Sequence, residues 1–214
     1  MDATIAPLTI HPLPPERLPD FLAFFDGPAF ADNPKWGSCY CQYLYVDHSK
    51  ENWHQRSLDE NRSAACSKIG CGEMQGYLAY QDGKVIGWCS AAPRPLMTAF
   101  DDQPEVDATH IGQIGCFVVA KAFRRQGLAS ALLQAACAGL QAQGMRRIQA
   151  TPRAEAGDDG AATDGAATDG SAHFGPLSMY LAAGFQVMRP DSDGLLIVER
   201  HLPVNEQATA LTPE

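Results

Sequence analysis

The sequence predicts a mixed α/β domain, because apolar runs typical of strands alternate with segments of helical periodicity. The clearest strand signal is the Asp82-Gly83 pair between the apolar runs 77–80 and 85–89. Both central residues of a tight hairpin turn need positive φ, which this pair tolerates. The clearest helix signal follows an apolar run at 114–119, and its residues recur every fourth position: Leu128, Leu132, Ala136 and Leu140.

The first half of the chain is expected to begin with two helices. Prolines and a glutamate favour a helix entry at 13–18, and apolar residues at helical spacing continue it to Phe25. Residues 33–46 are rich in Gly, Cys and Tyr and are expected to be irregular or briefly extended. The run Ser57-Leu58-Asp59-Glu60 has capping-box spacing, which predicts a helix that ends near Ile69, before two glycines.

The second half is expected to alternate strands and helices. After the strand at 114–119, four further features are expected: a helix that stops at Gly144, a strand at 146–151, a helix at 176–183 closed by Gly184, and a final strand at 195–198.

Residues 154–172 differ in composition from the rest of the chain. They contain a direct repeat of Ala-Ala-Thr-Asp-Gly, at 161–165 and 166–170, and have almost no side chains able to form a core. This composition predicts a mobile loop, because two pentapeptides cannot stack into a solenoid. The length of 214 residues fits one sizeable domain. We therefore expect a single domain over 1–202, which includes this loop, and a flexible tail over 203–214.

The charge balance excludes some classes of function. The chain has 16 Lys+Arg against 25 Asp+Glu, a net charge of −9, which argues against nucleic-acid binding. The seven cysteines and the absence of a basic, apolar leader at the start predict reduced thiols and a cytoplasmic location. The uncharged run 126–145 has membrane-span length but contains four glutamines and a helical stripe, so no membrane span is expected.

The junction between the 114–119 strand and the next helix carries Arg124 and Arg125. Cations at a helix N-terminus oppose the macrodipole and cost about 0.3–1 kcal/mol each. An anionic ligand would compensate, because free backbone N–H groups and arginines together form a phosphate site. Gly127 and Ala129 leave room for a diphosphate to approach the backbone. Alternatively, the arginines only point into solvent.

The run from Val119 to Ala129 resembles the acyl-CoA-binding motif of the GNAT superfamily of N-acetyltransferases. That motif is a strand, a short connection, Arg/Gln-x-x-Gly-x-Gly/Ala and a helix. Tyr180-Leu-Ala-Ala-Gly-Phe185 is similar to the Tyr-x-x-x-Gly-Phe ending of the family, and the run 87–94 fits its third strand. The resemblance covers about residues 72–200. It implies a GNAT-like fold, a mixed and mostly antiparallel twisted sheet flanked by helices.

The resemblance implies an N-acetyltransferase that moves an acetyl or related acyl group from acetyl-CoA to an amine by direct attack in a ternary complex. The strand backbone at Phe117, Val118 and Val119 is expected to hydrogen-bond the pantetheine arm. The pyrophosphate is expected at the turn, with these residues as its binding set: Arg124, Arg125, Gln126, Gly127, Leu128, Ala129 and Ser130.

Tyr180 corresponds to the family position that protonates or hydrogen-bonds the departing thiolate. Proton transfer from an unperturbed phenol to a thiolate is uphill by roughly 2 kcal/mol, so a hydrogen bond is as plausible as full transfer. The alternative is that Tyr180 is only a core residue of the last helix.

The general base departs from the family pattern. Many relatives carry a carboxylate in the middle of the fourth strand, where this chain has the run 113–116, Gln-Ile-Gly-Cys. Substitutes lie upstream at Glu105, Asp107 and His110, of which His110 has a suitable ordinary pKa. Ordered water could also take the proton. A non-catalytic acyl-CoA-binding or sensing module on the same fold therefore remains the alternative function.

The acceptor side is less well defined. Cys39 and Cys41 have no second ligand pair, so no metal is expected, and Tyr40 with the two thiols could instead line the acceptor pocket. Arg94 either contacts the acceptor or is solvated. The acceptor is expected to be a small-molecule or peptide amine, and the chain could form a homodimer.

The acid excess lies in two segments. Residues 101–107 hold four acids and 154–172 hold five, with no base in either, whereas 108–153 hold six basic residues and no acid. We expect this local positive charge to surround the pyrophosphate turn and the acidic 101–107 loop to favour a cationic acceptor.

Overall fold

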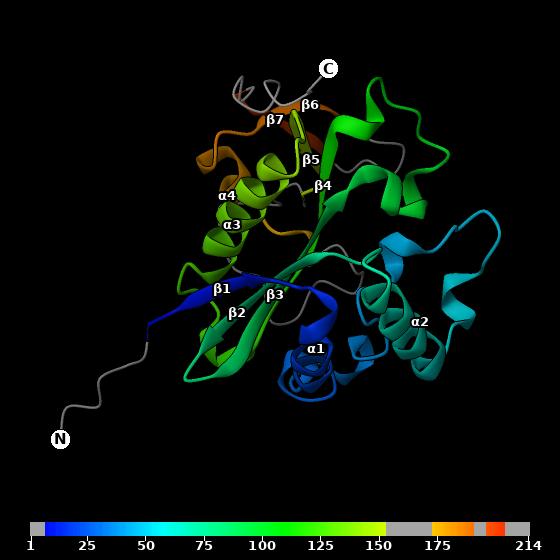
Figure 1. Cartoon of the computed structure of the whole chain (residues 1–214), viewed down its shortest axis with the longest axis vertical. Helices are drawn as coiled ribbons and strands as arrows, with labels where there is room; N and C mark the ends of the chain where they lie inside the picture. The colour runs from blue at the N-terminus through cyan, green and yellow to red at the C-terminus, as the bar shows by residue number, and fades with distance from the viewer. Residues whose placement is uncertain (1–6, 153–172, 191–195, 204–214) are drawn as a thin grey trace, which may run out of the picture.

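The computed structural model describes residues 7–152, 173–190 and 196–203 (Figure 1). They form a seven-stranded sheet in the order β1-β2-β3-β4-β5-β7-β6. The strands are β1 (Thr9–Pro12), β2 (Gly76–Gln81), β3 (Lys84–Pro93), β4 (Ile111–Val119), β5 (Arg147–Ala150), β6 (Gln186–Pro190) and β7 (Leu196–His201). The α-helices are α1 (Leu18–Phe25), α2 (Leu58–Gly70), α3 (Leu128–Ala142) and α4 (Leu177–Ala182). The predicted mixed α/β class is confirmed.

All neighbouring strands are antiparallel except β4 and β5, which are parallel. Their pairing is short, since only Ile111–Gln113 of β4 stand opposite Arg147–Gln149 of β5. On its other edge β4 pairs with β3 as far as Val119. The register shifts where Ser90 alone faces two residues of β4, a β-bulge that re-aims the side chains there.

Two hydrophobic cores lie on opposite faces of the sheet. The first contains residues of α1 and α2, and the second contains residues of α3 and α4 (Figure 1). Strand alternation divides β2 between them, because Leu78 belongs to the first core while Tyr77 and Ala79 belong to the second. The helical stripe predicted in α3 is buried: Leu128, Leu132, Leu133, Ala136, Cys137 and Leu140.

The locally encoded elements are confirmed. Asp82 and Gly83 both have positive φ in the β2–β3 turn, and Ser57 and Glu60 form a complete capping box at α2. The irregular 33–46 segment contains short 3₁₀ turns, including η3 (Pro34–Trp36) and η4 (Tyr43–Tyr45).

Two strands were not predicted. β1 and β6 pair with one neighbour each at opposite edges of the sheet. All of β6 is exposed, so it lacks the alternation of apolar residues that marks a half-buried strand. The predicted mobile loop lies outside the described residues, as does all of the predicted tail except Pro203.

Candidate functional site

One edge of β4 has no described partner strand after its short pairing with β5 ends. We call this part the open edge of β4. Beyond Gln113, no described strand pairs with that edge. The amide of Ala120 donates to the Ile86 carbonyl on β3, so alternation turns the amides of Val119 and Phe117 toward the open edge. The side chains of Phe117 and Val118 are buried in the cores, which leaves the backbone available there.

The turn after β4 leads directly into α3. Arg125 has φ 60° and Gly127, the N-cap, has φ 78°, and no side chain caps the helix. The first N–H groups of α3 therefore lack a side-chain partner at an exposed turn, an arrangement suited to an anion. Both arginines precede the N-cap rather than occupying the first helical turn, so they oppose the macrodipole less than the sequence indicated.

The two arginines have different environments. Arg124 makes a two-pronged ion pair with Asp32, with N–O distances of 2.6 and 3.0 Å, and its Nε donates to the Val119 carbonyl at 2.9 Å. The hydrogen bonds from Arg124 lower the pKa of the Asp32 carboxyl, and the positive charge of Arg124 adds to this effect. Arg125 is exposed, and no ion pair within the described ranges holds it. Asp32 was not singled out in the sequence, where 92 positions separate it from Arg124.

The predicted concentration of positive charge around the turn is wrong in part. Arg147 pairs with Ile111, at the opposite end of β4 from the turn and about 26 Å of strand away. It is also neutralised locally, because its guanidinium lies 3.1 Å from Glu199 and 3.6 Å from Glu105. Among the described basic residues, Lys121, Arg124 and Arg125 lie close to the turn.

Tyr180 is fully buried in α4. Its ring makes edge-to-face contacts with Phe117 on β4 and with Phe185, at centroid distances of 6.4 and 5.2 Å. Its hydroxyl donates to the Phe174 carbonyl at 2.9 Å. Burial raises the pKa of Tyr180 well above its ordinary value, so the phenol is protonated. The structure thus brings Tyr180 beside the open edge of β4, with its proton directed at Phe174.

His173, which the sequence analysis did not single out, also lies at this edge. Its ring is hydrogen-bonded to the backbone of Phe117 and packs edge-to-face on Trp36 and Phe30, at centroid distances of 4.5 and 5.6 Å. Its Nε2 is buried and has no hydrogen-bond partner in the described structure. Burial lowers the pKa of His173. The only sequence signal was its position seven residues before Tyr180.

The three bases suggested by the sequence are not gathered at this edge. Glu105 lies 2.7 Å from Arg189, and despite partial burial the pKa of its carboxyl is lowered by this contact and by Gln149 and Arg147. Asp107 is exposed with a left-handed backbone. The His110 ring forms a hydrogen bond with the adjacent Thr109 hydroxyl at 3.4 Å.

A buried polar row crosses the sheet where β4 and β5 part. Gln113 stands opposite Gln149, which stands opposite Glu199. Arg94 is buried rather than solvated, and its Nη1 donates to both glutamine oxygens at 3.0 and 3.2 Å. Its guanidinium also stacks on Phe100, 4.4 Å from the ring centroid. Arg94 therefore bridges the two strands at the point of their separation.

Of the two cysteines, Cys41 belongs to the first core and Cys39 is half-buried. Cys41 accepts a hydrogen bond from the Trp88 indole at 3.0 Å, and burial raises the pKa of both Cys39 and Cys41. Tyr40 donates to Asp26 at 2.5 Å. No group of three or more metal-ligating side chains occurs in the part of the chain that the structure describes.

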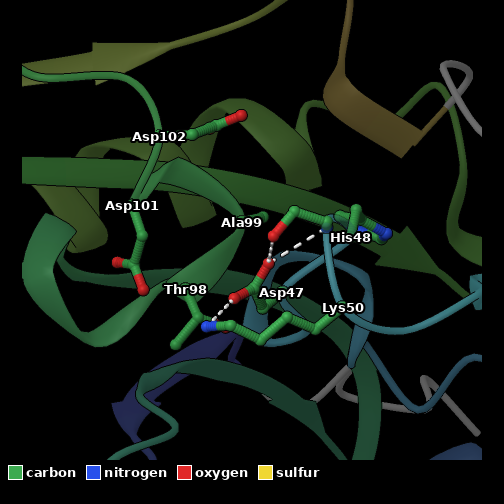
Figure 2. A pocket seen from close by; sticks show the side chains of 8 residues that line it. Asp47, His48, Lys50, Thr98, Ala99, Asp101 and Asp102 are labelled. Atoms are coloured by element: carbon green, nitrogen blue, oxygen red, sulfur yellow. Dashed lines mark hydrogen bonds and ion pairs between the residues drawn. The ribbon is translucent and has the colours of Figure 1, made fainter.

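A pocket of about 250 Å³ lies between the 47–50 turn and the 98–102 segment (Figure 2). Asp101 and Asp102 line it together with Asp47, whose carboxylate contacts Lys50 at 2.5 Å and Ser49. The Lys50 contact lowers the pKa of Asp47 to about 2. With three carboxylates against one lysine, the pocket favours cationic groups.

The acetyltransferase (GNAT) family profile matches residues 38–161. The chain belongs to this acetyltransferase family. The GNAT match and fold favour acetyl transfer over a non-catalytic acyl-CoA-binding module, and no curated protein is similar enough to add a specific activity.

Solved GNAT structures share the fold. An N-acetyltransferase from Staphylococcus aureus is 16% identical, with TM-score 0.54 over 92% of this chain and 100% of that one. A GNAT acetyltransferase from Streptococcus pneumoniae is 17% identical, with TM-score 0.50 over 92% and 100%. PaiA N-acetyltransferase from Thermoplasma acidophilum, solved with coenzyme A, is 13% identical, with TM-score 0.51 over 92% and 99%. Within the described ranges, no helix has the length and apolar character to cross a membrane.

Proposed function

We propose that this GNAT acetyltransferase transfers the acetyl group of acetyl-CoA to an amine by direct attack in a ternary complex. The observation that carries the proposal is the unpaired edge of β4, which leads through the turn into the uncapped N-terminus of α3. Such an edge offers a row of amides to an extended polar chain, and the helix end offers amides to a diphosphate.

The residues present fit acetyl-CoA in this orientation. The amides of Phe117 and Val119 would pair with the pantetheine arm, and the turn from Arg125 to Ser130 would hold the diphosphate. Arg125 supplies the free cation, while Arg124 fixes the turn through Asp32 and Val119. Because the turn follows Val119, the thioester end of the arm would lie near Phe117.

When bound, acetyl-CoA supplies an acyl group activated as a thioester. Strand amides near Phe117 would polarise the carbonyl, and Tyr180 would assist the leaving sulfur by a hydrogen bond or proton. The raised pKa of buried Tyr180 disfavours full ionisation of the phenol and favours the hydrogen-bonding role.

We propose that the acceptor is a cationic amine, either a small molecule or a peptide amino group. The acidic pocket supports this class of acceptor. Phe100, which follows the pocket residue Ala99 in the sequence, lies against Arg94 of the strand junction. A KM for amines that does not change with salt would argue against this acceptor class.

The test is an acceptor screen with the full chain. Acetylated product should be followed by mass spectrometry, because free cysteines such as exposed Cys71 would react with thiol reagents. Acetyl-CoA binding by calorimetry together with a product from at least one cationic amine is the expected result. Binding without turnover across the panel would support the non-catalytic module instead.

A further inference from the structure

The family's strand carboxylate is absent from β4, and Gln113 occupies that region as part of a buried row with Arg94 and Gln149. A direct attack by an amine nevertheless requires a group that takes a proton from the attacking nitrogen. Such a group must lie near the thioester end of the site and must have a lone pair that is not engaged elsewhere. His173 has such a lone pair on Nε2, and its interaction with the Phe117 backbone puts its ring beside the residue at which the thioester end is expected.

The hydrogen bond of His173 determines its tautomer. Its Nε2 has no partner, so Nδ1 makes the bond with the Phe117 backbone. That bond favours the protonated ring, so the ring nitrogen is the donor and the Phe117 carbonyl is the acceptor. In the neutral ring Nδ1 then carries the hydrogen, and Nε2 is a bare acceptor. A buried nitrogen without a partner calls for a ligand.

The surroundings keep this acceptor neutral. Burial is the main cause of the lowered pKa of His173, and the positive charge of Arg124 adds to it. Arg124 is in turn paired with Asp32. The ring rests on Trp36 and Phe30, which carry no charge and hold its orientation. At neutral pH His173 can therefore accept a proton.

We propose that His173 is the general base of the acetyl transfer, in place of a carboxylate on β4. This inference rests on the proposed function. The cationic acceptor first loses one proton to solvent, which gives the neutral amine. As the bond between the amine nitrogen and the acyl carbon forms, the nitrogen becomes acidic and Nε2 takes a second proton. The bond between carbon and sulfur breaks and the electron pair stays on sulfur. The Tyr180 hydroxyl stabilises it by exchanging its hydrogen bond to the Phe174 carbonyl for one to the sulfur. His173 then returns the proton to solvent.

One short segment positions both proton-handling groups. His173 bonds to Phe117, and the next residue, Phe174, accepts the hydrogen bond of Tyr180 at 2.9 Å. Tyr180 also contacts the Phe117 ring. The base and the leaving-group residue are thus held around one residue of β4, the residue at which the thioester end of the arm is expected.

The test compares His173→Asn with the parent enzyme on an amine found in the acceptor screen. Asparagine can keep the donor to the Phe117 carbonyl but has no basic nitrogen at the position of Nε2. We expect kcat to fall about 100-fold, within the range for loss of a general base. The affinity for CoA, measured by calorimetry, should stay within threefold of the parent. His54→Asn, at an exposed histidine, should leave both quantities unchanged.

Two further measurements distinguish a base from a structural residue. The kcat/KM of the parent should rise with pH through a pKa below about 6.5, and this limb should be absent in His173→Asn. An amine of low basicity, already neutral at pH 7, should lose kcat by a similar factor, because its nitrogen also becomes acidic as the bond to the acyl carbon forms. If His173→Asn keeps its kcat, whether or not it loses CoA affinity, the assignment is overturned. If the parent acetylates no amine, the proposed function itself fails.

Discussion

Arg124 and Asp32 join the end of β4 to the segment after η2 (Pro28–Phe30), with N–O distances of 2.6 and 3.0 Å. The same guanidinium donates through Nε to the Val119 carbonyl. Arg124 is thereby engaged within the fold at the turn where the sequence suggests anion binding. Of the two arginines, this leaves Arg125, two residues before the helix N-cap, available to a ligand.

Asp32→Asn should destabilise the protein slightly and in a pH-dependent way. The pair is partly exposed, at 37% for Arg124 and 18% for Asp32, so a loss below about 1 kcal/mol is expected. The pKa of Asp32 is lowered in the folded state, so its stabilisation is present above the unfolded value of about 3.9 and is lost as pH falls through the folded value. Thermal unfolding should show a difference at pH 7 that vanishes at low pH. A constant difference would contradict this role.

Arg125→Gln should weaken CoA binding about tenfold, the effect of losing one charge-assisted hydrogen bond of about 1.5 kcal/mol. Calorimetry at two salt concentrations measures it, and the effect should shrink at high salt. Lys84→Gln removes an equally exposed cation at the β2–β3 hairpin and serves as the control. Equal losses in the two variants would show only a general charge effect.

Gly127→Glu should abolish CoA binding, whereas Gly144→Glu should not. The two glycines have φ 78° and 86° near opposite ends of α3, and a Cβ would meet no atom within 4 Å at either position. Both substitutions therefore carry the same backbone strain, about 1 kcal/mol. Only Gly127 lies at the turn proposed for the diphosphate. Unchanged affinity in Gly127→Glu would show that the site is misassigned.

Tyr180→Phe should lower kcat and also lower stability by about 1–3 kcal/mol, because the buried Phe174 carbonyl loses its donor. Tyr80→Phe is the control, since the Tyr80 hydroxyl bonds to Asp20 in a half-exposed setting. Urea unfolding and steady-state kinetics separate the two effects. Full kcat with reduced stability would mean that Tyr180 is only a core residue.

Arg94→Met should cost about 2–3 kcal/mol of unfolding free energy, because it leaves the buried oxygens of Gln113 and Gln149 without their shared donor. Arg94→Lys should recover only part of it, since an ammonium does not reproduce the planar fork. Urea unfolding compares the two variants with the parent. If Arg94→Lys is as stable as the parent, the bridge between β4 and β5 does not need the guanidinium.

The sequence predicted those features that depend on neighbouring residues. The Asp82-Gly83 turn, the Ser57 capping box and the stripe of α3 each follow from spacing within one element. The candidate cofactor site was also predicted from neighbouring residues, because it follows from the order of strand, turn and helix at 117–130.

Features that depend on contacts between distant segments were not predicted. Asp32 and Arg124 are 92 positions apart in the sequence, and His173, which contacts Phe117, follows β5 in the chain. The predicted cluster of charge failed for the same reason, because Arg147 lies at the other end of β4. Sequence proximity does not determine which end of a strand a charge occupies.

Hydrogen–deuterium exchange with and without saturating CoA measures which backbone amides the cofactor covers. If the arm lies on the open edge of β4 and the diphosphate at the start of α3, exchange of the amides of Phe117, Val119 and 127–130 should slow at least tenfold. The amides of α2, on the other face of the sheet, should not change. Protection confined to other segments, or none at 117–130 under saturating CoA, would contradict the account.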